Sequence, residues 1–410
     1  METLPRLLSA YPDKVGICRV GASAEDVRVI APDELLALFA KATSARTEGD
    51  ISAPARLFRA TGRYVEARLR AIHDRLVAGP AARRRFFDSV QPGDIILALG
   101  GSWTHTRFGQ SLRTLKARYG VRFAILIHDV LPISHPQFVA AKHTPNFERW
   151  LDDMRATWDF VLTPSQASAD LLTAHLLKIG APVPPIRPIP FGFGFSNAAD
   201  PAESPIETEP YVLFVSTFDI RKNHALAYRI WERLIAAHGA DAVPNLVFAG
   251  GKGWGMHQFW HDMHASNGLN GKIRVFTNLT DAEIARGYED CKFSIFPSFC
   301  EGWGLPVSES LSHGKLCVAS NATSIPEIGG EAVDYFDPYN EDEAYAAVER
   351  ALFQPGYLEA REAYIRDRFR PPIWDDTARA IVEVLGALAN AADTQAATAP
   401  EASPLPQPAA

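Results

Sequence analysis

The stretch Pro297-Ser-Phe-Cys-Glu-Gly-Trp-Gly-Leu-Pro-Val-Ser-Glu309 joins an apolar run, residues 293–296, to a segment with helical spacing, residues 305–312. The same alternation continues on both sides of it. The other apolar runs are Tyr211–Val215, Asn245–Ala249, Lys272–Thr277 and Leu316–Ala319, and the other helical patterns are His224–His238 and Asp281–Asp290. Apolar runs without polar alternation, separated by helices, are typical of a parallel sheet covered on both faces. The second half of the chain is therefore predicted to be a doubly wound α/β lobe, which binds ligands at the carboxyl ends of its strands.

The first half has a less regular α/β pattern. Its predicted strands are Asp94–Leu99, Arg122–Ile127 and Phe160–Leu162, and a predicted helix with Val65, Leu69, Ile72 and Leu76 on one face covers residues 63–76. A segment rich in Pro, Ala, Glu and Ser, residues 197–210, predicts a linker. The predicted domains are lobes at residues 1–200 and 201–372, a last helix at 373–390 and a disordered Ala/Pro-rich tail at 391–410.

The composition excludes several classes of protein. With 47% hydrophobic and 22% charged residues among 410, the chain is typical of a globular protein. Its net charge of −7 argues against a nucleic-acid partner, and no apolar run reaches the ~18 residues of a transmembrane helix. The four cysteines form no CxxC pair and no signal peptide is apparent, so we expect no zinc site, no disulfide framework and a cytoplasmic location. The charge is uneven, +6 over residues 1–200 and −13 over 201–410, which suggests lobes with different partners.

Two carboxylates and two glycines make the quoted stretch a candidate binding site. Glu301 and Glu309 stand eight residues apart, with Gly302, Gly304 and a predicted helix start between them. Glycines allow close approach to the backbone, the N–H groups of a helix start favour phosphate, and each carboxylate accepts hydrogen bonds from vicinal hydroxyls. The pattern fits a phosphorylated, hydroxyl-rich ligand. A tight strand-to-helix turn with a solvated glutamate fits the same residues.

This segment resembles glycosyltransferase family 4, whose members are retaining enzymes of the GT-B fold. Glu301 and Glu309 match the family's Glu-x7-Glu motif, and Ser324-Ile-Pro-Glu-Ile-Gly329 matches a downstream segment. The resemblance implies that Glu301 contacts the hydroxyls of the donor sugar and Glu309 the ribose of the nucleotide. The resemblance further implies that a stretch of backbone faces the diphosphate and sugar, formed by Gly302, Trp303, Gly304 and Leu305. It also implies two Rossmann-like lobes facing across a cleft, the first on the acceptor side and the second binding the donor, with the C-terminal helix crossing back.

A second match is Ser216-Thr-Phe-Asp-Ile-Arg-Lys-Asn223, directly after the first strand of the second lobe. The family has a basic pair here that neutralises the departing diphosphate, and Arg221 and Lys222 occupy those positions. A fixed cation stabilises the negative charge that develops on the leaving group. Ser216 and Thr217 are expected donor-binding residues, although many relatives carry Gly in place of Ser216. A basic pair on a solvated turn is the alternative.

The glycine-rich run Gly250-Gly-Lys-Gly-Trp-Gly255 has GxGxG spacing rather than the GxGxxG of a dinucleotide fingerprint. A plain glycine turn explains it. It also resembles the second donor-lobe loop of the family, which implies that Gly251 and Lys252 form a secondary phosphate contact. Asn278 and Leu279, after the next predicted strand, are expected to line the nucleobase slot.

In the first lobe, His128 follows the predicted strand that ends at Ile127 and begins an HDxxP motif. A single histidine at a strand end is more often structural. The family places a histidine in this context beside the donor sugar, where it would hydrogen-bond the sugar and support the positively charged transition state. Ser165 and Gly101 each follow a predicted strand and are candidate acceptor-side residues.

No Asp-x-Asp occurs, so the usual metal–diphosphate bridge of the other large glycosyltransferase fold is missing from the sequence. We expect chemistry without a metal or cofactor, with Arg221, Lys222 and a helix start in the place of the cation. The resemblance implies retention by front-face attack, in which the leaving phosphate takes the acceptor proton.

The N-terminal region departs from the family pattern. Residues 1–11 resemble the first helix of the family and residues 15–20 its second strand, so we expect the first strand and its glycine loop to be missing. A basic stretch at residues 83–87 is a candidate contact with an anionic membrane together with Arg59, Arg63, Arg68, Arg70 and Arg75, and a solvated helix face is the alternative.

The resemblance to bacterial mannosyltransferases implies a hexosyltransferase of exopolysaccharide or O-antigen assembly. GDP-mannose is the favoured donor and a glycan, free or linked to a lipid diphosphate, the expected acceptor, at the inner face of the plasma membrane. A non-catalytic nucleotide-sugar-binding protein, or a nucleotide-sugar epimerase or phosphorylase of similar fold, is the alternative.

Overall fold

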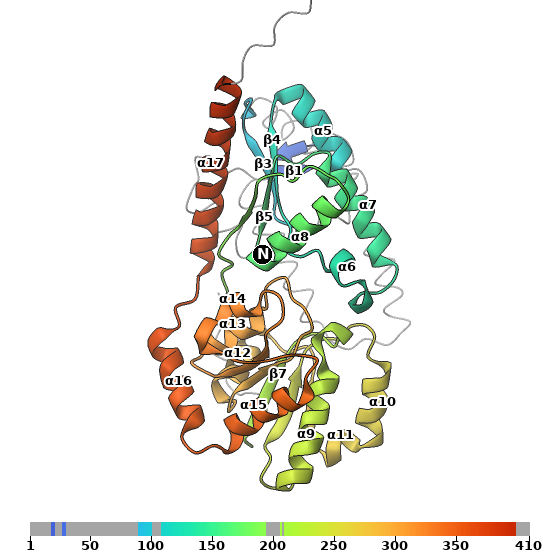
Figure 1. Ribbon diagram of the computed structural model, residues 1–410, viewed down its shortest axis with the longest axis vertical. Helices are drawn as coiled ribbons and strands as arrows, with labels where there is room; N and C mark the ends of the chain where they lie inside the picture. Colours follow the sequence, from blue (N-terminus) through green and yellow to red (C-terminus); the bar gives the residue numbers. More distant parts are fainter. Residues whose placement is uncertain are drawn as a thin grey trace, which may run out of the picture.

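Two α/β lobes make up the described part of the chain (Figure 1). The computed structural model describes residues 18–20, 27–29, 89–100, 108–193, 206 and 209–398, and only the backbone of 18–20, 27–29 and 392–398. We call residues 89–193 the N-lobe and residues 206–368 the C-lobe. The N-lobe is uppermost in Figure 1, and the last helix, α17, returns to it from the C-lobe.

The C-lobe is built on a six-stranded parallel sheet. Its strands are β7 (Tyr211–Val215), β8 (Asn245–Ala249), β9 (Ile273–Phe276), β10 (Ser294–Phe296), β11 (Cys317–Ser320) and β12 (Asp334–Phe336). They lie side by side in the order β12-β11-β10-β7-β8-β9, and every pair is parallel. When the strands are numbered 1 to 6 in chain order and read across the sheet from β9 to β12, this is the Rossmann order 3-2-1-4-5-6. The direction of winding reverses between β7 and β10, so the loops that follow these two strands border the crevice where such sheets bind ligands.

Helices cover this sheet, and apolar side chains between them form its core. They are α9 (His224–His238), α10 (His257–Ala265), α11 (Asn267–Asn270), α12 (Asp281–Asp290), α13 (Leu305–Ser312), α14 (Ile325–Gly329), α15 (Glu341–Phe353), α16 (Tyr357–Arg368) and two short 3₁₀ turns, η4 (Ile220–Lys222) and η5 (Gly330–Ala332). The ring of Phe214 packs edge-on against those of Phe248 and Phe296, and Trp231 of α9 is fully buried in the same core. The predicted bounds of α9, α12 and α13 are confirmed. Thr280 starts α12 with a capping box.

The N-lobe has a four-stranded parallel sheet. Its strands are β3 (Ile95–Ala98), β4 (Arg122–Leu126), β5 (Phe160–Thr163) and β6 (Ile186–Pro188), in that order across the sheet. Its helices are α5 (Phe108–Tyr119), α6 (Leu131–Ser134), α7 (His143–Arg155), α8 (Gln166–Lys178) and the 3₁₀ turn η3 (Pro136–Phe138). Sequential parallel strands joined by helices confirm the predicted α/β class of the N-lobe.

The expectation for residues 15–20 is corrected. The strand there, β1 (Cys18–Val20), pairs antiparallel with β2 (Val27–Val29). Within the described residues, β1 and β2 form a separate two-stranded sheet and β1 is not a member of the parallel sheet of the N-lobe.

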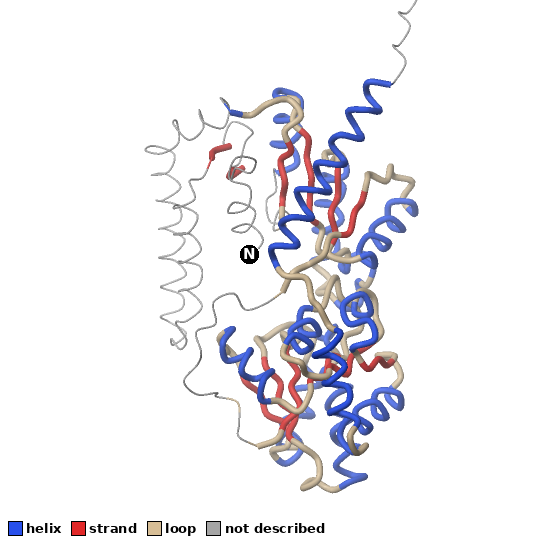
Figure 2. The backbone as a smooth tube through the Cα atoms, turned by 90° about the vertical axis from the view of Figure 1, so that its left-hand side faces the viewer, coloured by secondary structure: helices blue, strands red, loops and turns tan. Residues whose placement is uncertain are grey.

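Helix α17 (Trp374–Thr398) crosses back to the N-lobe, as expected (Figure 2). Ala378 and Ile381 of α17 pack into one apolar cluster with Leu126 and Leu162 of the N-lobe sheet, and Gly192 N–H donates to Thr377 Oγ1 at 2.7 Å. The predicted end of this helix at residue 390 and the disorder predicted from 391 are wrong for residues 391–398, which are helical. Four of these eight residues are alanines, the strongest helix formers, and they extend a helix that packing already holds in place.

Some predicted features lie outside the described residues: the helix at 63–76, the basic stretch at 83–87, Gly101, most of the linker at 197–210 and residues 399–410. Among the helices that are described, none combines the length and apolar character needed to cross a membrane.

Candidate functional site

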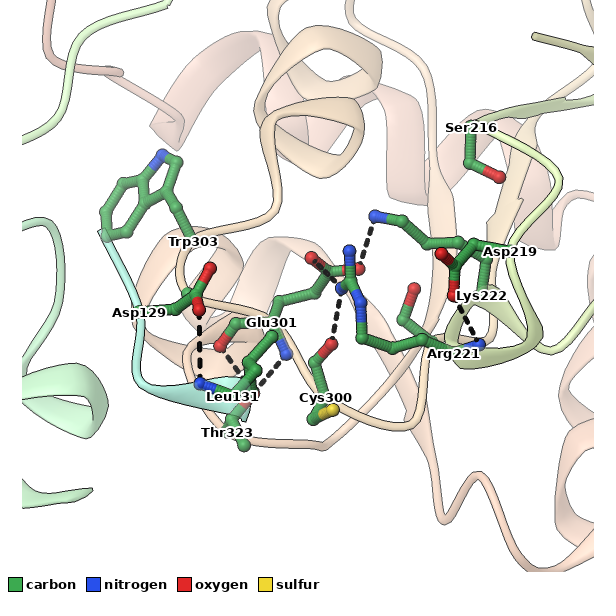
Figure 3. Close-up of polar contacts among 12 residues, drawn as sticks. Asp129, Leu131, Ser216, Asp219, Arg221, Lys222, Cys300, Glu301, Trp303 and Thr323 are labelled. Atoms are coloured by element: carbon green, nitrogen blue, oxygen red, sulfur yellow. Dashed lines mark hydrogen bonds and ion pairs between the residues drawn. The ribbon is translucent and has the colours of Figure 1, made fainter. Parts of the chain in front are cut away.

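The predicted basic pair, Arg221 and Lys222, and the predicted sugar-binding Glu301 form one cluster, which we call the cation cluster (Figure 3). Lys222 Nζ lies 2.6 Å from Oε1 of Glu301, and Nη1 of Arg221 lies 2.6 Å from Oε2. Both oxygens of one carboxylate are therefore shared between two cations. The side chains of Lys222 and Glu301 are only 12% and 8% exposed, so this ion-pair network is well shielded from solvent.

The sheet order explains why residues from distant parts of the sequence meet. Lys222 ends the 3₁₀ turn η4 after β7, and Glu301 follows β10, the neighbour of β7 at the point where the winding reverses. Asp219 caps η4 by accepting the Arg221 N–H at 3.0 Å, and Asn223 adopts a left-handed conformation with φ of 59° before α9 begins. Asn adopts this conformation more readily than most residues, and the side chain of Asn223 donates to the Pro338 carbonyl at 3.2 Å. The backbone therefore turns sharply and leaves both basic side chains facing the loop after β10.

The loop after β10 is held by two hydroxyls from the segment that begins α14. Thr323 Oγ1 lies 2.8 Å from Glu301 N and 2.9 Å from Glu301 O, so it both accepts from and donates to the same residue. Ser324 Oγ donates to Glu301 O at 3.1 Å. Arg221 adds a 2.7 Å bond to the carbonyl of Cys300. The backbone at Glu301 is fixed, and only its side chain is left to rearrange.

The electrostatics of the cluster favour an anionic ligand. Burial by itself raises the pKa of Glu301, but Lys222 and Arg221 lower it below the ordinary value, so the carboxylate is ionised. Burial lowers the pKa of Lys222, an effect that Glu301 partly offsets. Two cations and one carboxylate leave a net positive charge, which an anion such as a diphosphate can balance.

Asp129 is a residue of this site that the sequence analysis did not single out. It lies in the N-lobe directly after His128, and its Oδ1 accepts the Leu131 N–H at 3.1 Å. Burial raises the pKa of Asp129, although the Leu131 hydrogen bond and the charge of Arg221 act in the opposite direction. Figure 3 shows its carboxylate beside Glu301 and Trp303. The HDxxP motif contains Asp129, but only the closeness of the lobes shows that it faces the C-lobe.

The side chain of His128 contacts its own lobe. Its Nε2 lies 3.0 Å from the carbonyl oxygen of Leu99, and its ring packs edge-on against Phe191 with centroids 5.6 Å apart. Its backbone, in contrast, touches the C-lobe, because a Cβ added at Gly302 would lie 2.3 Å from His128 O. Gly302 is therefore required for the contact between the lobes. The role of the His128 imidazole at the donor sugar stays a prediction.

Glu309 lies apart from the cation cluster, on α13. Tyr288 donates its hydroxyl to Glu309 Oε2 at 3.0 Å. Burial raises the pKa of Glu309 to about 7, with the Tyr288 hydrogen bond acting against this rise. Gly304, the residue directly before α13, has a φ of 126°, which favours glycine. The sequence analysis missed Tyr288, because α12 brings it to Glu309 only in the folded lobe.

The glycine-rich loop after β8 packs on the loop after β7. A Cβ at Gly250 would lie 1.8 Å from Ser216 O, and one at Gly253 would lie 2.4 Å from Phe218 O. These glycines are needed for backbone contact within the lobe, in agreement with the plain-turn interpretation. Gly251 and Lys252 are exposed beside this contact, so their expected phosphate contact stays a prediction.

The remaining predicted residues divide into exposed and packed positions. Thr217 and Asn278 are exposed at strand ends, whereas Ser216 is buried with its hydroxyl 3.2 Å from His224 Nε2. Leu279 packs against the core of the C-lobe. Trp303 and Leu305 pack against the N-lobe cluster that contains Phe191 and the α17 side chains. Ser165 donates its hydroxyl to Gly302 O at 2.8 Å, so it contacts the C-lobe.

Comparison with known proteins agrees with this geometry. Residues 196–368, which include β7 to α16, match the family of glycosyl transferases group 1. We call residues 196–368 the group 1 domain after this match. Residues 66–180 match a second family, the N-terminal domain of glucosyltransferase 3-like proteins. The cation cluster and Glu309 both lie inside the group 1 domain.

Solved structures share the arrangement of two lobes. An α,α-trehalose 6-phosphate synthase from Burkholderia multivorans superimposes with a TM-score of 0.55 at 15% identity, covering 78% of this chain and 75% of that one. The sucrose-phosphate synthase from Thermosynechococcus elongatus gives a TM-score of 0.54 at 18% identity, covering 77% of each chain. These similarities and the two parallel sheets confirm the predicted GT-B fold of this chain.

Curated relatives are similar over shorter segments. The O-antigen chain mannosyltransferase B of Escherichia coli is 29% identical over 153 residues, which are 37% of this chain and 39% of that protein. The serotype-specific mannosyltransferase WbdA of Escherichia coli is 32% identical over 119 residues, 29% of this chain and 15% of that protein. The matched segments thus span less than half of either relative. They confirm that this chain resembles O-antigen mannosyltransferases over these segments.

Proposed function

We propose that the protein is a glycosyltransferase that transfers a hexose from a nucleotide-sugar to a sugar acceptor in cell-surface polysaccharide assembly. One observation carries the proposal: Lys222 and Arg221 each bind one oxygen of the Glu301 carboxylate. This cluster lies in the group 1 domain, at the point where the winding of the sheet reverses. Mannose from GDP-mannose is the favoured donor because two of the similar proteins are mannosyltransferases. A lipid-diphosphate-linked glycan at the inner face of the plasma membrane is the favoured acceptor.

The donor diphosphate is proposed to bind Lys222 and Arg221. These cations already hold an anionic group, the Glu301 carboxylate, at 2.6 Å. A diphosphate carries more charge than a carboxylate, so it competes for the same cations and repels Glu301. The freed carboxylate then accepts hydrogen bonds from the hydroxyls of the donor sugar. Phosphate binding and sugar recognition are thereby linked through one side chain.

The cations also serve the chemical step. As the glycosidic bond breaks, negative charge grows on the leaving diphosphate, and Lys222 and Arg221 stabilise it in a site shielded from water. In this proposal, no metal is needed for that role. Retention of configuration by front-face attack requires that the leaving phosphate oxygen takes the proton of the acceptor hydroxyl, and it needs no protein nucleophile.

Glu309 is proposed to bind the ribose of the nucleotide. Its carboxylate already accepts the Tyr288 hydroxyl and has further acceptor positions for ribose hydroxyls. Asn278 and Leu279 follow the edge strand β9 of the same sheet and are proposed to contact the base.

A transfer assay tests the proposal. The wild-type protein, Glu301→Gln and Lys222→Ala are incubated with GDP-mannose, UDP-glucose or UDP-galactose and with mannobiose as acceptor, without and with chelator. We expect transfer by the wild type from one donor, retained in chelator and with retained anomeric configuration by NMR, and a loss of about 100-fold or more in both variants. Lys178→Ala, an exposed lysine of α8, is the matched control.

The same assay separates the alternatives. Binding of a nucleotide-sugar without transfer or hydrolysis would favour a non-catalytic binding protein. Conversion of the donor sugar while it stays attached to the nucleotide would favour an epimerase.

A further inference from the structure

Glu327 lies in the C-lobe but binds the first turn of an N-lobe helix. It belongs to α14, in the segment Ser324-Ile-Pro-Glu-Ile-Gly329. Its Oε2 accepts the Gln166 N–H at 2.7 Å, and its Oε1 accepts the Ala167 N–H at 2.7 Å. These are the first two residues of the 13-residue helix α8. The carboxylate thus caps two N–H groups that have no partner inside the helix, at its positively polarised end.

The same turn of α8 is joined to the loop of the candidate site. The hydroxyls of Ser165 and Ser168 both point to one carbonyl of the C-lobe, that of Gly302, at 2.8 and 3.1 Å. Ser168 Oγ also lies 3.3 Å from the carbonyl oxygen of His128. The start of α8 therefore contacts both the residue that follows Glu301 and the N-lobe residue expected at the donor sugar.

The segment that carries Glu327 is tied to Glu301 from the other side. Thr323 and Ser324, directly before α14, hold the backbone N–H and carbonyl of Glu301. A closed set of contacts results: the 323–327 segment holds Glu301 and reaches α8, and α8 holds Gly302. Moving the lobes apart breaks the α8 contacts together.

We propose that Glu327 is a positioning residue of the transfer reaction, which holds the start of α8 so that His128 of the N-lobe and Glu301 of the C-lobe face the same donor sugar. This inference rests on the proposed function. The Glu327 carboxylate binds the start of α8 rather than Arg221, Lys222 or Glu301, so it acts through the position of α8. The nucleotide contacts proposed above all belong to the C-lobe, so Glu327 affects turnover and not nucleotide binding.

A second contact between the lobes limits the effect of losing the contact between Glu327 and α8. The rings of Phe138 and Phe299 stack across the lobes with centroids 4.8 Å apart and planes 5° from parallel. The lobes stay in contact without Glu327, but α8 is less well placed. Since Glu327 and Gln166 are exposed, salt weakens their interaction.

Amide hydrogen exchange and kinetics on the full chain test the proposal. In Glu327→Ala we expect faster amide exchange at residues 166–167 and an unchanged Kd for GDP. We also expect a kcat for GDP-mannose turnover about two- to fivefold lower, because that is the fold-change that corresponds to the free energy of a charge at a helix N-terminus. Glu327→Gln keeps one acceptor oxygen and should fall between. Raising the salt concentration should lower the kcat of the wild type toward that of Glu327→Ala. Glu331→Ala is the matched control, because its carboxylate accepts from Tyr364 within the C-lobe.

The outcomes are distinguishable. Unchanged exchange at 166–167 in Glu327→Ala would show that the contact with α8 does not form in solution. Faster exchange with an unchanged kcat would show that the contact exists but does not position the site, and either result overturns the proposal. If the wild type turns over no nucleotide-sugar at all, the proposed function fails and the positioning role with it, whereas the exchange result still decides the contact.

Discussion

Lys222 Nζ lies 2.6 Å from Glu301 Oε1 although 79 residues separate them in the chain. Arg221 takes the second oxygen of the same carboxylate. The glutamate expected to bind sugar and the cations expected to bind diphosphate thus contact one another. A ligand that carries both a sugar and a diphosphate can replace these two internal ion pairs with contacts of its own.

Removing the carboxylate charge should raise affinity for a nucleoside diphosphate. In Glu301→Gln, Lys222 and Arg221 lose their internal counter-ion and become available to phosphate. We expect Kd values for GDP and UDP about fivefold or more below wild type by titration calorimetry, together with a loss of transfer. The variant should unfold at lower temperature because two shielded cations lose their partner. Equal or weaker binding of both nucleotides would contradict the exchange of Glu301 for diphosphate.

Removing one cation should have the opposite effect on binding. In Lys222→Ala, Arg221 alone must balance Glu301, so the net positive charge of the cluster disappears. We expect weaker GDP binding and turnover reduced by about 100-fold, since one fixed charge at a developing anion contributes about that much. Binding is measured by calorimetry and turnover by GDP release, with Lys178→Ala as the control. Wild-type turnover in Lys222→Ala would remove this residue from the mechanism.

Stability should depend on pH through Glu309. Its pKa is about 7 in the folded protein against 4.5 for an unperturbed glutamate, so the folded state binds more protons than the unfolded chain between these values. The contribution of Glu309 to stability is therefore lost as pH rises from 4.5 to 7, on the order of 3 kcal/mol. Glu309→Gln removes the titration, so its melting temperature, relative to wild type, should rise across this window. Parallel melting curves of the two proteins from pH 5 to pH 8 would contradict the raised pKa.

A methyl group at Gly302 should separate the lobes. A Cβ there would lie 2.3 Å from His128 O and 2.8 Å from Asp129 Cβ, so the backbone of one lobe must move. We expect Gly302→Ala to keep nucleotide binding, which the C-lobe provides, and to lose most transfer activity. Small-angle scattering should show a larger particle. Gly386→Ala on α17, where a Cβ meets nothing within 4 Å, is the control and should behave as wild type.

Much of the C-lobe was predictable because its signals are local. Buried parallel strands are continuous apolar runs, α9 and α12 have apolar spacing, and Thr280 is a recognisable start for α12, so these elements follow from neighbouring residues. Strand-end loops of a parallel sheet gather at one edge, and the family resemblance assigned Lys222 and Glu301 to the same donor site at such an edge. The end of α17 was missed because a local Ala/Pro composition was taken as disorder, although packing of its first half on the N-lobe supports the helix.

The residues that were missed reach the site through contacts between elements. Tyr288 meets Glu309 only when α12 packs beside α13, and Thr323 meets Glu301 only when the loops after β10 and β11 lie together. Asp129 and Glu327 depend on how one lobe sits against the other. No spacing along the chain encodes these distances.

The sequence by itself determined the α/β class, the strand-end positions of the site residues and the types of charge that they carry, because these follow from local apolar patterns and from the geometry of parallel strands. Only the tertiary structure decided which charges neutralise one another. The ion pairs at Glu301, the pKa of Glu309 near 7 and the capping of α8 by Glu327 each depend on burial and on distances of a few ångströms between segments far apart in sequence. Electrostatic interactions vary steeply with both quantities, and neither can be obtained from the order of residues alone.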